Sequence, residues 1–173
     1  MGGSLIAHII REISIKDVED FIKLLSKIYD ESEYTLYNPG EYTPSISSVS
    51  DRLERIITSP RNTVYVAEQD DQLVGYAFIT TEDFERKRHE AVITIGVRQL
   101  YQKHGIGMAL VNATEAWSIN HDIRRIEASV VPENARAVEL FKAAGFNIEG
   151  ELKDKLYING QYFNKYVMAK LLI

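Results

Sequence analysis

Residues 97–108, a strand end followed by a short loop and the start of a helix, contain the residues best suited to bind a ligand. Gly105 and Gly107 have no side chain, so the backbone there can approach a ligand closely. The first N–H groups of a helix have no partner within it and lie at the positive end of its dipole, which favours an anion such as a diphosphate. Lys103 adds a positive charge beside them. The segment is therefore a candidate diphosphate site.

Two common phosphate motifs do not fit this segment. A P-loop requires Gly-Lys followed by Ser or Thr, and no such run follows here. A dinucleotide fingerprint requires a third glycine, where this chain has Leu110. Taken alone, the two glycines are as consistent with a tight strand-to-helix turn as with a binding loop.

Two segments of the chain together resemble the GNAT superfamily of acyl-CoA N-acyltransferases. Gln102-x-x-Gly105-x-Gly107 is similar to the pyrophosphate loop of that family, and residues 131–146 are similar to its next motif. The resemblance extends over essentially the whole chain in the order of its elements. It implies an N-acetyltransferase that moves the acetyl group of acetyl-CoA to a primary amine of a small molecule, an amino acid or a peptide N-terminus.

The resemblance also assigns residues to the cofactor. A strand end would contribute backbone groups to the pantetheine arm and the thioester, the loop would hold the pyrophosphate, Asn134 would hydrogen-bond the arm, and Phe141 would pack beside it. The implied cofactor-binding residues are Ile95, Gly96, Val97, Gln102, Lys103, His104, Gly105, Ile106, Gly107, Met108, Asn134 and Phe141. Because Asn is a favoured N-cap, Asn134 could instead serve the helix that follows it.

For catalysis, the resemblance implies that a neutral amine attacks the thioester directly and that the N–H group of Val97 stabilises the oxyanion. Glu33 and Glu90 are candidate general bases, with Glu31 and His89 as alternatives beside them, although a carboxylate in a polar segment is usually a solvated surface group. Tyr34, Tyr37 and Tyr42, in the loop that holds Glu33, could form an aromatic wall for a cationic amine or pack on the core.

The chain departs from the family at Phe141, where many relatives place a tyrosine as general acid. A phenyl ring cannot donate a proton, so Tyr101, Tyr166 or water would have to protonate the leaving thiolate. The missing tyrosine also motivates an alternative function from another class, a catalytically weak sensor or interaction module that binds acetyl-CoA.

Hydrophobic periodicity predicts the elements that position these residues. Apolar side chains recur at helical spacing after Asp17, again before Pro60, and in residues 105–120 and 134–144. Strand-like runs lie at 9–13, 63–67, 73–80, 91–97 and 123–131, and a hairpin covers 146–172. Turns are expected at Asp70-Asp71 and Asn159-Gly160.

With the resemblance, these elements predict the α/β (α+β) class: a GNAT-like mixed, mostly antiparallel sheet of about seven strands flanked by about four helices. One N-acetyltransferase domain is expected over residues 1–173, with residues 1–4 interpreted as an incidental leader. No internal repeat or long linker divides the chain.

Composition excludes several classes of function. The chain has 173 residues and no cysteine, so thiolate catalysis, disulfides and zinc ribbons are excluded and a reducing compartment is favoured. Its four histidines show no metal-ligand spacing, so we predict no metal. A net charge of −5 argues against a nucleic-acid partner, even beside the basic run at 86–89. No signal peptide or spanning segment is recognisable, which predicts no membrane partner and a cytoplasmic location, and a homodimer is left open.

Overall fold

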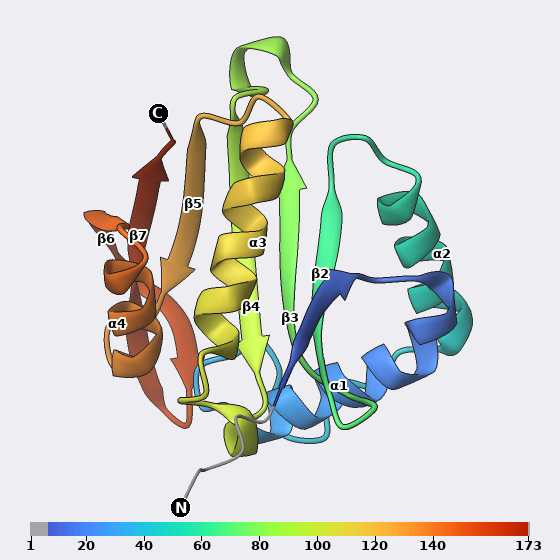
Figure 1. Cartoon of the computed structure of the whole chain (residues 1–173). Helices are drawn as coiled ribbons and strands as arrows, with labels where there is room; N and C mark the ends of the chain where they lie inside the picture. The colour runs from blue at the N-terminus through green and yellow to red at the C-terminus, as the bar shows by residue number, and fades with distance from the viewer. Residues whose placement is uncertain (1–6, 173) are drawn as a thin grey trace, which may run out of the picture.

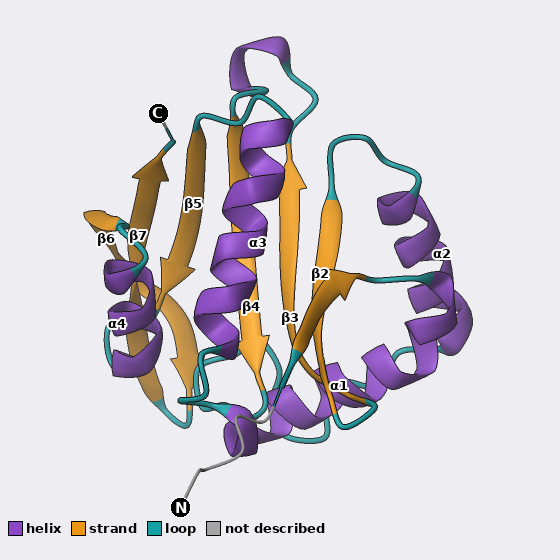
Figure 2. Ribbon diagram, viewed as in Figure 1, coloured by secondary structure: helices purple, strands orange, loops and turns teal. Residues whose placement is uncertain are grey.

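The computed structural model describes residues 7–172, whose strands form one sheet in the order β1-β2-β3-β4-β5-β7-β6 (Figures 1 and 2). The strands are β1 (Ile9–Glu12), β2 (Thr63–Gln69), β3 (Gln72–Thr81), β4 (Glu90–Val97), β5 (Arg125–Val130), β6 (Asn147–Ile158) and β7 (Gln161–Leu171). The β4–β5 pair is parallel and the other five pairs are antiparallel. The expected mixed, mostly antiparallel sheet of seven strands is confirmed; the leader assigned to residues 1–4 lies outside the described residues.

Four α-helices cover the two faces of this sheet: α1 (Val18–Glu31), α2 (Ile46–Ile57), α3 (Ile106–Asn120) and α4 (Ala135–Ala143). Single turns of 3-10 helix precede α1, β4 and α3, at Ile15–Asp17, Glu85–Lys87 and Gln99–Tyr101. Within residues 7–172, none of the helices combines the length and apolar composition needed to cross a bilayer.

Helices α1 and α2 bury their apolar sides against one face of the sheet. The predicted helical stripe is confirmed, because Val18, Phe21, Leu25 and Ile28 are all buried in the core beneath α1. The start of α1 is held by the Asp17 carboxylate, which accepts hydrogen bonds from the Ser14 N–H and from Arg11, each at 2.8 Å.

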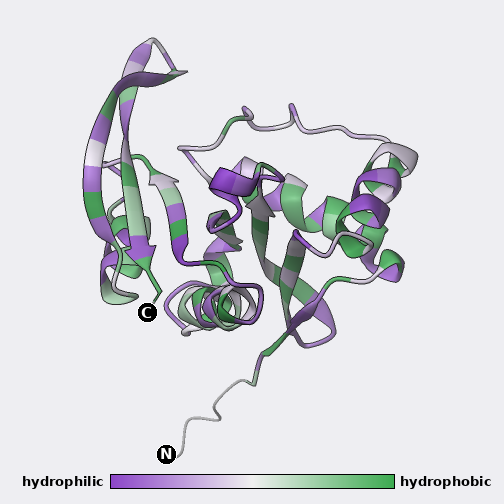
Figure 3. Cartoon of the chain, turned by 90° about the horizontal axis from the view of Figure 1, so that it is seen from above, coloured by the Kyte–Doolittle hydropathy of each residue, from purple (hydrophilic) through white to green (hydrophobic). Residues whose placement is uncertain are grey.

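Helices α3 and α4 cover the other face. In Figure 1, α3 crosses the middle of the sheet and α4 lies beside β5, β6 and β7. The core on this face includes Ile93 of β4, Val111 of α3, Ala128 of β5 and Phe141 of α4. Consecutive residues are buried in the central strands, such as residues 74–77 of β3, as expected for a sheet covered on both faces. Figure 3 shows that strands and helices alike carry hydrophobic residues interspersed with hydrophilic ones.

The two predicted hairpin turns are confirmed by their backbone geometry. Asp70 and Asp71 have φ values of 51° and 57°, and Asn159 and Gly160 have φ values of 50° and 83°. Two consecutive residues with positive φ give the type I′ turn, which joins antiparallel strands without splaying them. These turns set the registers of the β2–β3 and β6–β7 pairs.

Candidate active site

The sheet opens between β4 and β5. The two strands pair only where Glu90–Val92 lies beside Arg125–Glu127, although β4 continues to Val97 and β5 to Val130. Figure 1 shows the two strands diverging toward the end of β4. The second half of β4 therefore has a partner on the β3 side only.

The register of β3 and β4 determines which backbone groups of β4 face this opening. The N–H of Arg98 donates to the Val74 carbonyl oxygen at 2.9 Å, and alternate residues of an antiparallel strand point toward the same partner. Gly96 therefore hydrogen-bonds toward β3, whereas the N–H groups of Ile95 and Val97 point toward the opening. A ligand lying between β4 and β5 would meet these two donors.

The loop that follows β4 leaves further N–H groups without partners. Lys103 and Gly105 both have positive φ, 64° and 82°, and α3 begins directly afterwards. Its first hydrogen bond runs from the Ala109 N–H to the Gly105 oxygen at 2.9 Å, so the N–H groups of residues 106–108 have no acceptor within the helix. A Cβ atom placed on Gly105 would meet nothing within 4 Å, so there is open space above this loop.

Gly107 has a different role from Gly105. A Cβ atom at this position would lie 3.0 Å from Cδ2 of Leu140, so the glycine allows α3 and α4 to pack closely. The side chain of Ile106 is buried in the core, so Ile106 can offer a ligand only its backbone. The predicted loop residues thus lie together, but only Lys103, His104 and Gly105 are exposed.

Gln102 connects the end of β4 with the start of α4. Its Nε2 donates to the Val97 carbonyl oxygen at 3.1 Å, and its Oε1 accepts a hydrogen bond from Arg136 in the first turn of α4. The side chain is therefore occupied in holding the loop. Sequence reasoning missed Arg136, although its position two residues after Asn134 could have indicated it.

Asn134 caps α4, as the alternative interpretation allowed. Its Oδ1 accepts a hydrogen bond from the Ala137 N–H at 3.3 Å. Its Nδ2 donates to none of the described residues, so the same side chain can cap the helix and still offer a donor to a ligand.

Phe141 lies in the core beneath α4 and is 5% exposed. Its ring packs edge-on against Phe146, with 5.0 Å between the ring centroids. The two tyrosines named as substitutes for a general acid lie apart, since Tyr166 pairs with Val130 at the end of β5 and Tyr101 packs against the core beneath α3.

The structure separates the two candidate bases. Glu90 lies at the start of β4, 3.7 Å from Lys87, and Val97 is seven residues further along the strand, a distance of about 23 Å. That distance leaves Glu90 out of reach of an amine at Val97. Glu33 is exposed in the loop after α1, beside Tyr34, whose ring packs on Phe163 of β7 at 5.6 Å.

Two carboxylates lie near Tyr34 in this loop. Desolvation and then the negative charges of Glu33 and Glu133 raise the pKa of the Tyr34 phenol. Glu133 precedes α4, so Tyr34 and its neighbour Glu33 lie near the segment that leads into α4. Of the two carboxylates Glu33 and Glu90, Glu33 is the one that lies in the same neighbourhood as the segment preceding α4.

Glu31, the last residue of α1, holds the end of β4. Its Oε1 accepts hydrogen bonds from Arg98 at 2.7 and 2.9 Å, and its Oε2 accepts one from the Gln99 N–H at 2.7 Å. This contact fixes α1 against the strand end that holds Val97. Sequence reasoning did not find it, because the partners are 67 residues apart.

An aromatic pocket of about 270 Å³ opens on the α1–α2 face, next to the same strand end. Tyr29, Tyr37, Tyr42 and Tyr76 line it, together with Leu25, Arg52, Phe78, Thr80 and Thr94. Thr94 is the β4 residue that lines the pocket, and at Gly96, two residues further along the same face, a Cβ atom would lie 2.5 Å from Cε1 of Tyr76. The aromatic wall expected from the loop tyrosines is thus formed by Tyr37 and Tyr42, whereas Tyr34 packs elsewhere.

Burial keeps the pocket phenols protonated. It raises the pKa of Tyr42 to about 12 and also raises the pKa values of Tyr29 and Tyr76. At neutral pH these hydroxyls can therefore donate hydrogen bonds but cannot act as bases.

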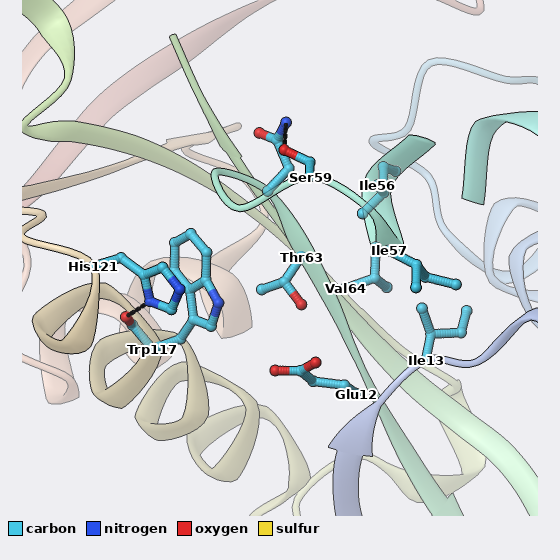
Figure 4. Close-up of a pocket in the computed structure, with 10 residues that line it drawn as sticks. Glu12, Ile13, Ile56, Ile57, Ser59, Thr63, Val64, Trp117 and His121 are labelled. Carbon is cyan, nitrogen blue, oxygen red and sulfur yellow. Dashed lines mark hydrogen bonds between the residues drawn. The ribbon is translucent and has the colours of Figure 1, made fainter. Parts of the chain in front are cut away.

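A second cavity, of about 180 Å³, lies at the other end of α3 (Figure 4). Trp117 and His121 line it, with their rings stacked at 3.9 Å, facing Ile13 and Thr63. The 15 residues of α3 separate it from the glycine loop by about 22 Å. It is therefore not part of the site described above. Within residues 7–172, no three His, Cys, Asp or Glu side chains gather as metal ligands would.

Comparisons with known proteins agree with this geometry. Residues 10–167 match the family model of the acetyltransferase (GNAT) domain. The L-amino acid N-acetyltransferase AaaT of Escherichia coli K12 is 32% identical over 119 residues, which cover 68% of this chain and 74% of that protein. The spermidine N(1)-acetyltransferase of the same organism is 26% identical over 122 residues, covering 70% of this chain and 64% of that protein.

Solved structures show the same fold. A GNAT-family acetyltransferase from Streptococcus pneumoniae superposes with a TM-score of 0.91 at 24% identity, over 96% of this chain and all of that one. The yncA protein of Salmonella typhimurium, solved with its cofactor acetyl-CoA, gives a TM-score of 0.81 at 17% identity, over 96% of this chain and 95% of that one. The chain belongs to the GNAT family of acyl-CoA-dependent acetyltransferases.

Proposed function

We propose that this enzyme transfers the acetyl group of acetyl-CoA to the primary amine of a small molecule that binds in the aromatic pocket. The contact between Tyr76 and Gly96 is the observation that supports this most directly. Tyr76 lines the pocket, and its ring lies against Gly96 in the strand whose end has N–H groups directed toward the opening between β4 and β5. An acceptor in the pocket would therefore lie next to the end of β4.

The residues around the opening fit acetyl-CoA. The free N–H groups of residues 106–108 and the open space at Gly105 suit a pyrophosphate, and Lys103 adds a positive charge. Asn134 offers its Nδ2 to the pantetheine arm. When bound, acetyl-CoA supplies the activated acetyl group as a thioester.

Two groups of the chain would act on the reacting atoms. The Val97 N–H points into the opening, where it would donate a hydrogen bond to the oxygen of the acetyl carbonyl as negative charge develops. Glu33 would accept the proton of the acceptor amine, directly or through a water. Gln102 and Glu31 would position these groups by holding the end of β4.

Release of free coenzyme A in the presence of amino acids, polyamines and N-terminal peptides tests the proposed activity. We expect release that depends on one class of acceptor. Tight binding of acetyl-CoA without release on any acceptor would instead favour the sensor or interaction module suggested by Phe141. A cytoplasmic location stays a prediction from the sequence.

Comparison of Glu33→Gln with Glu90→Gln tests the proposed base. Loss of a general base typically costs ~10²–10⁴-fold, so Glu33→Gln should lower the single-turnover rate by at least about 100-fold and flatten its rise with pH. Glu90→Gln, at the far end of β4, should leave the rate unchanged. Equal rates in both variants would remove Glu33 from the mechanism.

A further inference from the structure

The aromatic pocket contains one charged side chain, and that charge is positive. Among the residues that line the pocket, Arg52 of α2 is the single ionised group at neutral pH, and neither Asp nor Glu lines it. The chain as a whole has a net charge of −5. A lone cation in such a pocket would attract a negative group on a ligand.

Arg52 has no partner within the described part of the chain. None of the carboxylates in residues 7–172 lies within ion-pair distance of it, and its guanidinium donates no hydrogen bond there. By contrast, Arg11, Arg98 and Arg125 are each held by carboxylates at 3.0 Å or less. The guanidinium of Arg52 thus retains its donors for a ligand.

The position of Arg52 is set by the pocket wall. Its guanidinium carbon lies 5.2 Å from the centroid of the Phe78 ring, within the range of a cation–π contact. Arg52 lines the same pocket as Tyr29, Tyr42 and Tyr76, and its positive charge opposes the rise in their pKa values that burial causes. Arg52 therefore faces the same space as the tyrosines.

We propose that the acceptor carries a carboxylate, which Arg52 binds, while its amine points toward Gly96 and Val97. A planar guanidinium matches a carboxylate with two parallel hydrogen bonds, and the tyrosine hydroxyls can donate to the same oxygens. The aromatic walls suit an apolar side chain. The substrate class is thus amino acids with apolar side chains, and polyamines are disfavoured because they meet a positive charge and no carboxylate.

This inference rests on the proposed acetyltransferase activity and narrows its acceptor. Of the two relatives compared above, it favours the substrate class of the L-amino acid N-acetyltransferase over that of the spermidine enzyme. The carboxylate of an amino acid is one of its two charged groups, so converting the acid to its amide removes the feature that Arg52 would recognise.

The test measures kcat/KM for L-phenylalanine, L-leucine, their amides and spermidine, with the wild type and with Arg52→Gln. We expect Arg52→Gln to lower kcat/KM for the free acids by about 10- to 100-fold, mainly through KM, as expected for loss of a charge-assisted hydrogen bond. For the amides it should change kcat/KM less than about twofold. Comparing each acid with its own amide cancels differences in amine basicity, as in a double-mutant cycle.

Two further variants separate binding from folding. Arg55→Gln changes an exposed arginine on the same helix that does not line the pocket, so all acceptors should react as with the wild type. Arg52→Lys keeps the charge but loses the two-point geometry and should lower kcat/KM for the free acids by an intermediate amount.

Two results would overturn the carboxylate assignment and leave the acetyltransferase function standing. One is an Arg52→Gln substitution that changes kcat/KM equally for acids and amides; the other is a wild type that prefers amides or spermidine. Absence of coenzyme A release with every acceptor would overturn both.

Discussion

On the α3–α4 face, the groups that can hold a ligand belong to the backbone, whereas on the α1–α2 face they belong to side chains. The first face offers the N–H groups of residues 106–108 above a glycine with open space beside it. The second face offers four phenol hydroxyls and one guanidinium. The sheet lies between the two surfaces, and the end of β4 borders both. At Gly96 the missing side chain leaves room for the pocket residue Tyr76.

Because one surface is built from backbone groups and the other from side chains, a sequence motif can reveal only the first. Backbone groups are presented by a contiguous loop whose glycines are visible in the sequence. The pocket is assembled from two helices, a loop and two strands, between Leu25 and Thr94, so no local pattern encodes it. A binding surface common to the family can be built from the backbone, while acceptor selectivity depends on side chains that can differ between relatives.

Gly96→Val should produce the largest effect, because this residue lies at the end of β4, which borders both surfaces. The new Cβ would lie 2.5 Å from Tyr76 and 3.2 Å from Ile28, so the ring or the strand must move. Displacing the end of β4 by about 1 Å should lower the single-turnover rate by about 100-fold, and overpacking should destabilise the fold by about 1–3 kcal/mol. Urea unfolding and single-turnover acetyl transfer measure the two effects.

Val92→Thr is the matched control for this change. Val92 is on the same strand and the same face but is 45% exposed, so its substitution should change neither the single-turnover rate nor the stability of the fold. A Gly96→Val enzyme with normal rate and stability would show that the two surfaces are not coupled at this residue.

Phe141→Tyr tests whether the side chain at position 141 is buried in the core between the sheet and α4. Phe141 is 5% exposed against Phe146, and a buried hydroxyl without a partner costs about 1–3 kcal/mol, so the free energy of unfolding should fall by that amount. Phe84→Tyr, at a position that is 70% exposed, should leave stability unchanged. Unchanged stability together with faster single-turnover transfer would instead place the new hydroxyl beside the thioester sulfur, where many relatives have their acid.

Gly105→Ala should weaken acetyl-CoA binding by about 10-fold in calorimetry, because a methyl group would enter the space above the free N–H groups. Gly160→Ala is a close control, since Gly160 has nearly the same φ, 83° against 82°, and equally open surroundings, in a hairpin turn away from both surfaces. Both variants should lose similar stability. Equal acetyl-CoA affinities in the two would show that Gly105 only forms the turn.

Tyr42→Phe should have the smallest effect, and only at high pH. Burial raises the pKa of Tyr42 from 10.0 to about 12, so the unfolded chain loses this proton first and the stability supplied by the protonated phenol is lost as pH rises from about 10 to 12. Since Tyr42 is half-buried, solvent screening should reduce the effect to about 1 kcal/mol. Thermal unfolding between pH 8 and 12, in steps of about one unit, should show a shallower decline in the variant than in the wild type.

Tyr157→Phe, at a 66% exposed position beside the β6–β7 turn, serves as the control and should follow the wild type. If the stability of the Tyr42→Phe and Tyr157→Phe variants declines equally as pH rises, burial of the Tyr42 phenol in the pocket would be contradicted. The comparison thus tests whether the hydroxyls on the α1–α2 face are buried, as the pocket requires.

The sequence by itself determined the order of the elements and the position of the glycine loop before α3. Periodicity and turn residues act locally, so the helix after Asp17, the hairpin at Asn159-Gly160 and the helix start after Gly105 could be predicted, and all are confirmed. The resemblance of two short motifs was sufficient for the family, because both lie in contiguous segments. Asn134 as a cap could also be anticipated, since an N-cap acts on the helix that follows it.

Tertiary structure alone decided which of the scattered polar residues share a site. Glu33 and Glu90 look equivalent along the chain, but the sheet places Glu90 a full strand length from Val97. Only packing could show that Gly107 faces Leu140 or that Glu31 holds Arg98 from 67 residues away. The same holds for Arg52. It is a candidate ligand-binding residue only because other elements bring four tyrosines and Phe78 beside it. Long-range contacts depend on how helices and strands pack against one another, and the spacing of residues along the chain does not predict that packing.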